Sequence, residues 1–436
     1  MNTLPINSLS NNFLPKPGSF NIYSSFYIVF ILLIVYNKFL TNLLPSFTYL
    51  DEIFMGFFCL GFGYRIIVKQ KLDYLALGIC LTILLFILFT YLGKYYSTHV
   101  NVIAGALIHL KWFIFYYIVQ VLFWEDYLGL QRCINLIIII SLIGLLLNFL
   151  MQQQFNSIFN KGYFNMRSGR LRLIGFDMHP NNLGLLMMLI FLYYNFFSGI
   201  PSYFKVILSS FVFIGSVIFF VGTRNVLSIL PFVYIYLLFI KKDKVVSISI
   251  ITIFCAFLSI LLVFYGETII TETQENLESL TKEKDDTGYL RGLMIFHGFE
   301  IMEKNFPIGT GMSTFGTVLS QNSQVYYDIK FGRIPVLWNL EGSAIFDSNI
   351  ASVAGEAGFL GILIMLLLLY TIFYLSKKAL QLHPHLQCYC NLMLITVLIG
   401  CAVYPIFMNA YSAILYAVFL NLPLSKIRSD ENTYNN

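Results

Sequence analysis

Long apolar stretches recur along nearly the whole chain, and they constrain its fold more than any other feature. Each has about 17 to 25 residues, enough for a helix to cross a hydrocarbon core about 30 Å thick. Backbone N–H and C=O groups find no water there, so they must be paired within the segment, as they are in a helix. Charged residues make up only 11% of the 436 residues, whereas a soluble domain has about 25%. The sequence therefore predicts an all-α integral membrane protein.

The hydropathy pattern predicts about 12 transmembrane helices. Their expected ranges are 23–41, 47–66, 73–93, 100–123, 133–152, 180–198, 204–221, 223–240, 245–266, 349–375, 389–406 and 409–424. The expected organisation is a cytoplasmic tail at 1–22, nine helices within 23–266, a large loop at 267–348, three helices within 349–424 and a tail at 425–436.

Basic residues between the predicted spans set the orientation. Most of them fall on one side: Arg65, Lys69, Lys71, Arg132, Lys205, Lys241, Lys242, Lys244, Lys377, Lys378, Lys426 and Arg428. The positive-inside rule assigns this side to the cytoplasm. Lys38 and Lys94 lie at the other ends of spans, where a long side chain can reach the interface. Both termini are therefore expected inside, and the loops 153–179 and 267–348 outside.

These two outer loops are the functional candidates, because long connections in a compact protein usually carry function. The first is unexpectedly basic, with Lys161, Arg167, Arg170 and Arg172. The second opens with a run of acidic residues and then predicts a helix at about 288–304. The helical repeat is formed by Leu290, Leu293, Met294, His297 and Ile301. Asn305-Phe306-Pro307 would end this helix, and Gly309-Thr310-Gly311 would form a tight turn.

Arginines gathered on the outer side indicate an anionic partner. Arg291 lies near the start of the predicted loop helix, and Arg224 lies between two spans joined by almost no loop. A charge in that position is costly unless it is paired or hydrated. The planar fork of arginine suits phosphate oxygens better than the ammonium of lysine does. Contact with lipid headgroups is the alternative reading for any one of these side chains.

Four segments resemble, in the same order, the superfamily of O-antigen polymerases (Wzy-type) and O-antigen ligases. They are Arg172–Phe176 with His179–Gly184, then Gly222–Arg224, then Arg291 with Asn305–Gly311, and finally Asp347–Asn349 with Glu356–Gly361. The resemblance covers about residues 160–375, and the spans before it match by hydropathy alone.

The resemblance implies a membrane-embedded glycosyltransferase with a glycosyltransferase-C-like helical bundle. Its substrates would be oligosaccharide repeats on undecaprenyl pyrophosphate, used at the periplasmic face of the bacterial inner membrane. Carried over by position, Arg172, Arg224 and Arg291 would hold the pyrophosphate. Asp347 stands where the ligases usually have His, which favours an O-antigen or capsule polymerase over a ligase.

The reaction would join an anomeric carbon to a sugar hydroxyl and expel a lipid pyrophosphate. Fixed cationic donors can stabilise the charge that develops on this leaving group. The sequence has no Asp-x-Asp pair and no outer histidines at ligand spacing, so we expect a metal-independent site without cofactors. Asp347 and Arg291 are the candidate catalytic residues, with Asp347 as the base or as the cap of the following helix.

The candidate substrate-binding residues are Arg170, Arg172, Arg224, His179 and Glu356. Two alternatives stay open: Glu356 pairs with a neighbouring helix, and His179 is a packed or capping residue. His109 and Lys111 lie inside a predicted span and should face the bundle interior, where they could line a groove for a lipid tail or glycan. Glu125 and Asp126 lie too far along the chain to pair with them.

Competing functions remain at this point. A ligase would differ only in its acceptor, the lipid A core. A transporter of lipid-linked oligosaccharides would more often show internal repeats and paired broken helices, which the sequence lacks. The expected partners are the lipid-linked glycan donor and acceptor and the membrane lipids, with a chain-length regulator as a further candidate and no nucleic acid.

Overall fold

The computed structural model describes most of the predicted spans and parts of both candidate loops. The described residues are 22–67, 73–95, 98–124, 126–160, 166–167, 170–197, 203–221, 223, 225–240, 252, 290–321, 323–328 and 348–435. The predicted tail at 1–22 and the ninth predicted span at 245–266 lie almost wholly outside them.

Apart from one short antiparallel pair of two-residue strands, the secondary structure of the described residues is helical, so the all-α part of the predicted fold class is confirmed. The helices are α1 Ile22–Val35, α2 Asn37–Leu43, α3 Leu50–Ile67, α4 Tyr74–Leu92, α5 His99–Leu122, α6 Tyr127–Met151, α7 Gln153–Phe159, α8 Pro180–Phe197, α9 Tyr203–Gly215, α10 Ile229–Ile240, α12 Leu290–Lys304, α13 Val325–Asp328, α15 Asn349–Ala379, α16 Pro384–Val403 and α17 Ala410–Asn435. The strands are β1 Met166–Arg167 and β2 Arg170–Leu171. Short 3-10 helices lie at Pro45–Tyr49, Gly175–Asp177, Asn225–Ser228 and Val318–Ser320, and a π-helix lies at Ser216–Val221.

Six of the described helices are long and apolar enough to cross a membrane. They comprise Tyr74–Leu92, His99–Leu122, Tyr127–Met151, Asn349–Ala379, Pro384–Cys401 and Ala410–Asp430. The span predicted at 23–41 is bent by 73° between Val35 and Asn37 and would be a seventh. The one predicted at 204–221 changes into a π-helix at Ser216, so only a shorter apolar helix is left. The chain is thus a multi-pass membrane protein, while the count of 12 stays a prediction.

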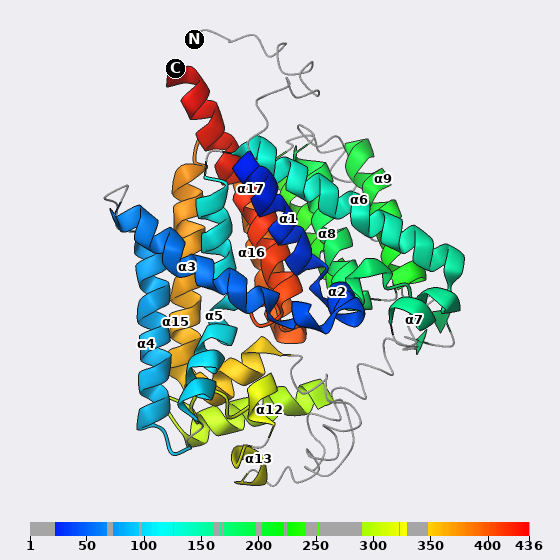
Figure 1. The fold of residues 1–436 in the computed structure, drawn as a ribbon. Helices are drawn as coiled ribbons and strands as arrows, with labels where there is room; N and C mark the ends of the chain where they lie inside the picture. The colour runs from blue at the N-terminus through cyan, green and yellow to red at the C-terminus, as the bar shows by residue number, and fades with distance from the viewer. Residues whose placement is uncertain are drawn as a thin grey trace.

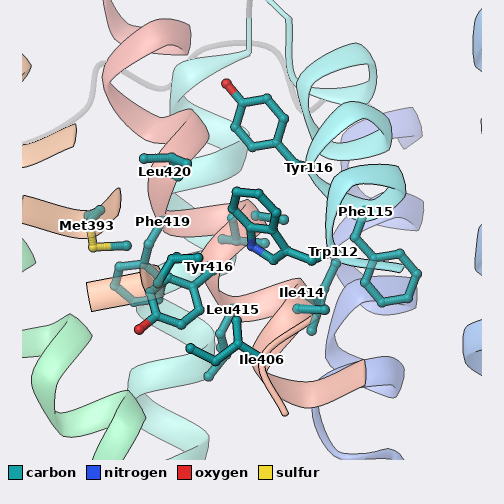
Figure 2. Close-up of a cluster of buried hydrophobic side chains, with 14 of the residues drawn as sticks. Trp112, Phe115, Tyr116, Met393, Ile406, Ile414, Leu415, Tyr416, Phe419 and Leu420 are labelled. Atoms are coloured by element: carbon teal, nitrogen blue, oxygen red, sulfur yellow. The ribbon is translucent and has the colours of Figure 1, made fainter. Parts of the chain in front are cut away.

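The centre of the bundle is the contact between α5 and α17. Figure 2 shows bulky side chains meeting there, among them Trp112 and Tyr116 of α5 and Ile414, Leu415, Tyr416 and Phe419 of α17. Asn421 of α17 also donates a hydrogen bond to the Tyr116 carbonyl oxygen, at 3.0 Å. These two helices therefore form a rigid core around which the other spans pack.

The two ends of the bundle differ. The C-terminal end of α17 projects from one end, while α12 and α13 lie across the opposite end, below α4, α5 and α15 (Figure 1). The predicted helix at 288–304 is confirmed as α12, with Leu293, Met294 and Ile301 buried.

Candidate functional site

Helix α15 is broken where the sequence predicts a glycine-rich motif. Gly358 has φ 65° and ψ −159°, which interrupts the helix. The segment after α12 fills the gap with backbone hydrogen bonds. The Thr310 N–H donates to the Gly355 carbonyl oxygen at 2.9 Å, and the Leu360 N–H donates to the Pro307 carbonyl oxygen at 3.1 Å. Two of the motif segments noted in the sequence are thereby joined.

Only glycine fits at the point of closest approach in this break. A Cβ atom on Gly309 would lie 2.6 Å from the Gly358 backbone nitrogen, and Gly309 itself has a positive φ of 73°. L side chains rarely adopt such a backbone conformation. The two glycines therefore allow the turn to enter the broken helix.

Glu356, two residues before the break, is the centre of a buried polar junction. Its side chain is fully buried. One carboxylate oxygen accepts hydrogen bonds from the Phe315 N–H and the Thr317 hydroxyl, both at 2.9 Å. The other oxygen lies 2.8 Å from Nε2 of His109. Both oxygens are thus occupied by protein groups from α5 and the 310–317 segment.

His109 and Lys111 of α5 face the bundle interior, as predicted. His109 pairs with Glu356, and the Lys111 ammonium lies 2.5 Å from a carboxylate oxygen of Asp51 on α3. Each pair joins α5 to a different helix. Buried charges of this kind are tolerated when they are paired, and here the partners come from distant parts of the sequence.

A second region brings together the other two motif segments. Leu173 N–H donates to the Phe220 carbonyl oxygen at 2.9 Å, and Nε of Arg172 donates to the Val221 carbonyl oxygen at 3.0 Å. Further along, a Cβ atom on Gly184 would lie 2.2 Å from the Thr223 hydroxyl oxygen. The chain following α9 therefore runs against both the arginine segment and the start of α8.

Asp177, which the sequence did not single out, anchors this second region. One carboxylate oxygen accepts hydrogen bonds from the Tyr411 hydroxyl and, at 3.3 Å, from the Ser141 hydroxyl. The other oxygen is buried and has no hydrogen-bond partner in the part of the chain that the structure describes. Burial raises the pKa of Asp177 to about 6, against the opposing effect of these two hydrogen bonds.

The loop between α16 and α17 connects the two regions. The Tyr404 hydroxyl donates to the Asn182 side-chain oxygen on α8. Three residues on, the Phe407 N–H donates to the Asn349 side-chain oxygen at the start of α15, at 3.0 Å. No pattern in the sequence pointed to this loop, because single polar residues at a span end are common.

A small, partly open cavity of about 60 Å³ lies beside Thr223, between α8, α16 and α17. Polar groups of Asn181, Thr223, Ser228, Thr396 and Tyr404 share its lining with apolar side chains that include Leu185, Met188, Val226, Ile399 and Ile406. The lining uses the beginning of α8 and the last turns of α16, so the cavity lies toward the end of the bundle that carries α12. Such a mixed lining suits an amphiphilic ligand.

The predicted site residues are described to different extents. His179 accepts a hydrogen bond from the Asn181 N–H at 3.2 Å through Nδ1, at the start of α8. Arg170 lies on β2 and Arg291 in the first turn of α12, and only their backbones are described. Arg224 and Asp347 lie outside the described residues.

The neighbouring residue bears on the alternative that Asp347 caps α15. Ser348 is the N-cap of α15, since its side chain accepts a hydrogen bond from the Ala351 N–H at 3.3 Å. The capping position is therefore occupied by Ser348, and a catalytic role for Asp347 stays a prediction.

Residues 209–366 match the model of a protein family described as O-antigen ligase. The matched range contains Thr223, α12 and the broken part of α15, whereas Arg172 and the start of α8 precede it. A search of curated proteins found no match.

Proposed function

We propose that the protein is a polymerase of the O-antigen polymerase and ligase superfamily, because residues 209–366 match the model of the family described as O-antigen ligase. It would join oligosaccharide repeat units carried on undecaprenyl pyrophosphate, for O-antigen or capsule, at the periplasmic face of the inner membrane. The match to a family described as O-antigen ligase supports an enzyme that transfers glycans. The polymerase assignment rests on Asp347 at the position where related ligases usually have His.

The cavity beside Thr223 is the observation that supports a lipid-linked substrate best. An undecaprenyl pyrophosphate glycan has an apolar tail and a strongly polar head, and the cavity lining offers both kinds of surface. Arg172 donates a hydrogen bond to the carbonyl oxygen of Val221, two positions before Thr223, so Arg172 lies on a segment that adjoins the one beside the cavity. A guanidinium near this opening is well placed to bind a pyrophosphate.

In the proposed reaction, the hydroxyl oxygen of one glycan attacks the anomeric carbon of another. The bond from that carbon to the pyrophosphate oxygen breaks, and its electron pair leaves with the lipid pyrophosphate. Arg172, Arg224 and Arg291 would stabilise the charge on this leaving group, each worth about 3 kcal/mol by comparison with oxyanion donors. Asp347 would accept the proton of the attacking hydroxyl, and Arg170 and His179 would contact the glycans.

The ligase is the second candidate, because the matched family is described by that activity. A ligase would use the same donor and the same leaving group, and would differ by transferring the finished chain to lipid A core. The cavity and the arginines fit both reactions.

The glycan phenotype of a strain that lacks this protein distinguishes the two. For the polymerase we expect lipid A core that carries a single repeat unit and no longer chains. Lipid A core without any repeat would instead identify a ligase, and unchanged chain lengths would contradict both assignments.

A further inference from the structure

The part of α15 that follows the break has a continuous exposed apolar stripe. Phe359, Leu363, Leu366, Leu367, Tyr370 and Tyr374 are all exposed. Their spacing puts them on one face of the helix. Because α15 is one of the spanning helices, this face lies against lipid chains, which are as apolar as these side chains.

The part of α15 before the break is different, because protein surrounds it. Every residue from Ala351 to Gly358 is buried. The remaining helix, Phe359–Ala379, is about 30 Å long at about 1.5 Å per residue, which equals the thickness of a hydrocarbon core. Lys377 and Lys378 are exposed at its far end, where basic residues commonly mark an interface. The break at Gly358 therefore coincides with one boundary of the membrane.

The exposed stripe continues from α15 onto Phe306, which lies just after the end of α12, and onto α12 itself. The Phe306 ring is 68% exposed, and its centroid lies 5.8 Å from that of Phe359. On α12 itself, Phe296 and Phe299 are 45% and 41% exposed. The opposite face of α12 is packed against α15, where a Cβ on Gly298 would lie 2.6 Å from the Ala351 carbonyl oxygen.

We propose that α12 lies in the plane of the membrane interface and that Phe296, Phe299 and Phe306 contact phospholipid directly. The occupant is lipid because these rings extend the lipid-facing stripe of α15 through the contact between Phe306 and Phe359. Aromatic rings favour the headgroup level, and helices in this plane bury one apolar face beside charged groups. Glu303 and Lys304, both exposed near the end of α12, are such groups.

This placement does not depend on the proposed reaction. The placement of α12 nevertheless has a consequence for the proposed reaction, because the backbone of Arg291 lies in the first turn of this helix. An interfacial α12 carries that residue at the level of phospholipid phosphates. The apolar face of α12 that the sequence predicts does not contact lipid, because its residues Leu293, Met294 and Ile301 are buried in the protein.

Photo-cross-linking in phospholipid vesicles tests the proposal. The benzophenone analogue of phenylalanine replaces Phe299 or Phe306 in the full chain, and mass spectrometry then detects peptides that carry a phospholipid. We expect lipid adducts at both positions, as at Leu367 in the α15 stripe. Tyr327 is the matched control, because it is an exposed aromatic on α13 (56% exposed), which lies beyond α12 (Figure 1), and should give no lipid adduct.

Three outcomes would overturn the proposal: no adduct at Phe299 and Phe306 while Leu367 reacts, adducts with a protein at these two positions, or equal lipid adducts at Tyr327. A second measurement uses the unsubstituted chain, in case a variant does not fold. A lipid-soluble diazirine should label the peptide that contains Phe296–Phe306, and the absence of label there, with α15 labelled, would equally contradict an interfacial α12.

Discussion

Two buried carboxylates, Glu356 and Asp177, show how the two halves of the candidate site differ. Glu356 uses both oxygens to accept hydrogen bonds from protein groups of two segments, α5 and residues 310–317. Asp177 accepts two hydrogen bonds on one oxygen, while its other oxygen has no partner among the described residues. The first carboxylate closes a junction that holds the broken helix together. The second stands beside a loop that leads, through Asn182 and Tyr404, to an open cavity.

The difference teaches which half can bind a ligand. A buried polar group with all its partners supplied by the protein fixes a geometry and leaves nothing for substrate. Polar groups near a cavity that lack a hydrogen-bond partner can gain a hydrogen bond when a polar ligand binds. We therefore propose a scaffolding role for the Glu356 carboxylate and a binding role for the cavity side, while the expectation that Glu356 contacts substrate stays a prediction.

Loss of Glu356 should have the largest effect. Glu356→Ala leaves the Phe315 N–H, the Thr317 hydroxyl and His109 buried without their acceptor. At about 1 to 3 kcal/mol for each orphaned group, we expect the free energy of unfolding to fall by roughly 3 kcal/mol or more. Thermal unfolding in detergent, together with the yield of folded protein, measures this.

Two further variants make that prediction specific. Glu356→Gln keeps an oxygen for two of the donors and places an amide near His109, so a loss of about 1 kcal/mol is expected. Glu303→Ala removes an exposed acid from α12 and should change stability by less than about 0.5 kcal/mol. If Glu356→Ala unfolded at the same temperature as the parent, the junction would not be a scaffold.

Filling the cavity should impair activity without affecting the fold. Ile399 of α16 lines the cavity, and Ile399→Trp would occupy space that the lipid-linked substrate needs. We expect polymerisation to fall by about tenfold or more, equivalent to ~1.4 kcal/mol. Leu398→Trp is the matched control, because Leu398 is the neighbouring residue, is 47% exposed and does not line this cavity. Full activity of a folded Ile399→Trp protein would exclude the cavity from substrate binding.

The last prediction concerns the pH dependence of stability. The pKa of Asp177 is raised to about 6 from an ordinary value near 4, so the folded protein keeps a proton that the unfolded chain releases. The contribution of Asp177 to the free energy of unfolding should be fully present below about pH 4 and should fall by up to about 3 kcal/mol as the pH rises from 4 through 6. Asp177→Asn should remove this fall from the thermal unfolding profile.

Asp328 provides the control for that profile. A hydrogen bond from the Tyr95 hydroxyl lowers the pKa of this exposed carboxyl, so its contribution has the opposite sign. Asp328→Asn should leave the fall between pH 4 and 6 in place. An unchanged fall in Asp177→Asn would show that other groups cause it.

Periodic features of this chain could be predicted from the sequence, and single contacts could not. The helix at 288–304 was predicted because five residues repeat at helical spacing, and it is observed as α12 at Leu290–Lys304. The inward direction of His109 and Lys111 followed from the cost of a charge in lipid. Their partners did not follow, since His109 and Glu356 are 247 positions apart and no local pattern joins them.

The missed residues share a physical cause. Asp177, Tyr404 and Ser348 owe their roles to the packing of separate segments, and an isolated Asp, Tyr or Ser has many ordinary uses. The bend between Val35 and Asn37 was missed for a related reason, because hydropathy measures how apolar a stretch is and not whether it is straight. Proximity in the folded chain had to be observed.

The most direct test of the central claim is a reaction with purified protein in phospholipid vesicles, with undecaprenyl pyrophosphate-linked repeats as the only glycan. We predict lipid-linked chains of many repeats, one undecaprenyl pyrophosphate released per bond formed, and no chains when Arg172→Ala replaces the parent. Folded parent protein that makes no chain longer than one repeat, but transfers glycan once lipid A core is added, would contradict the polymerase and establish the ligase.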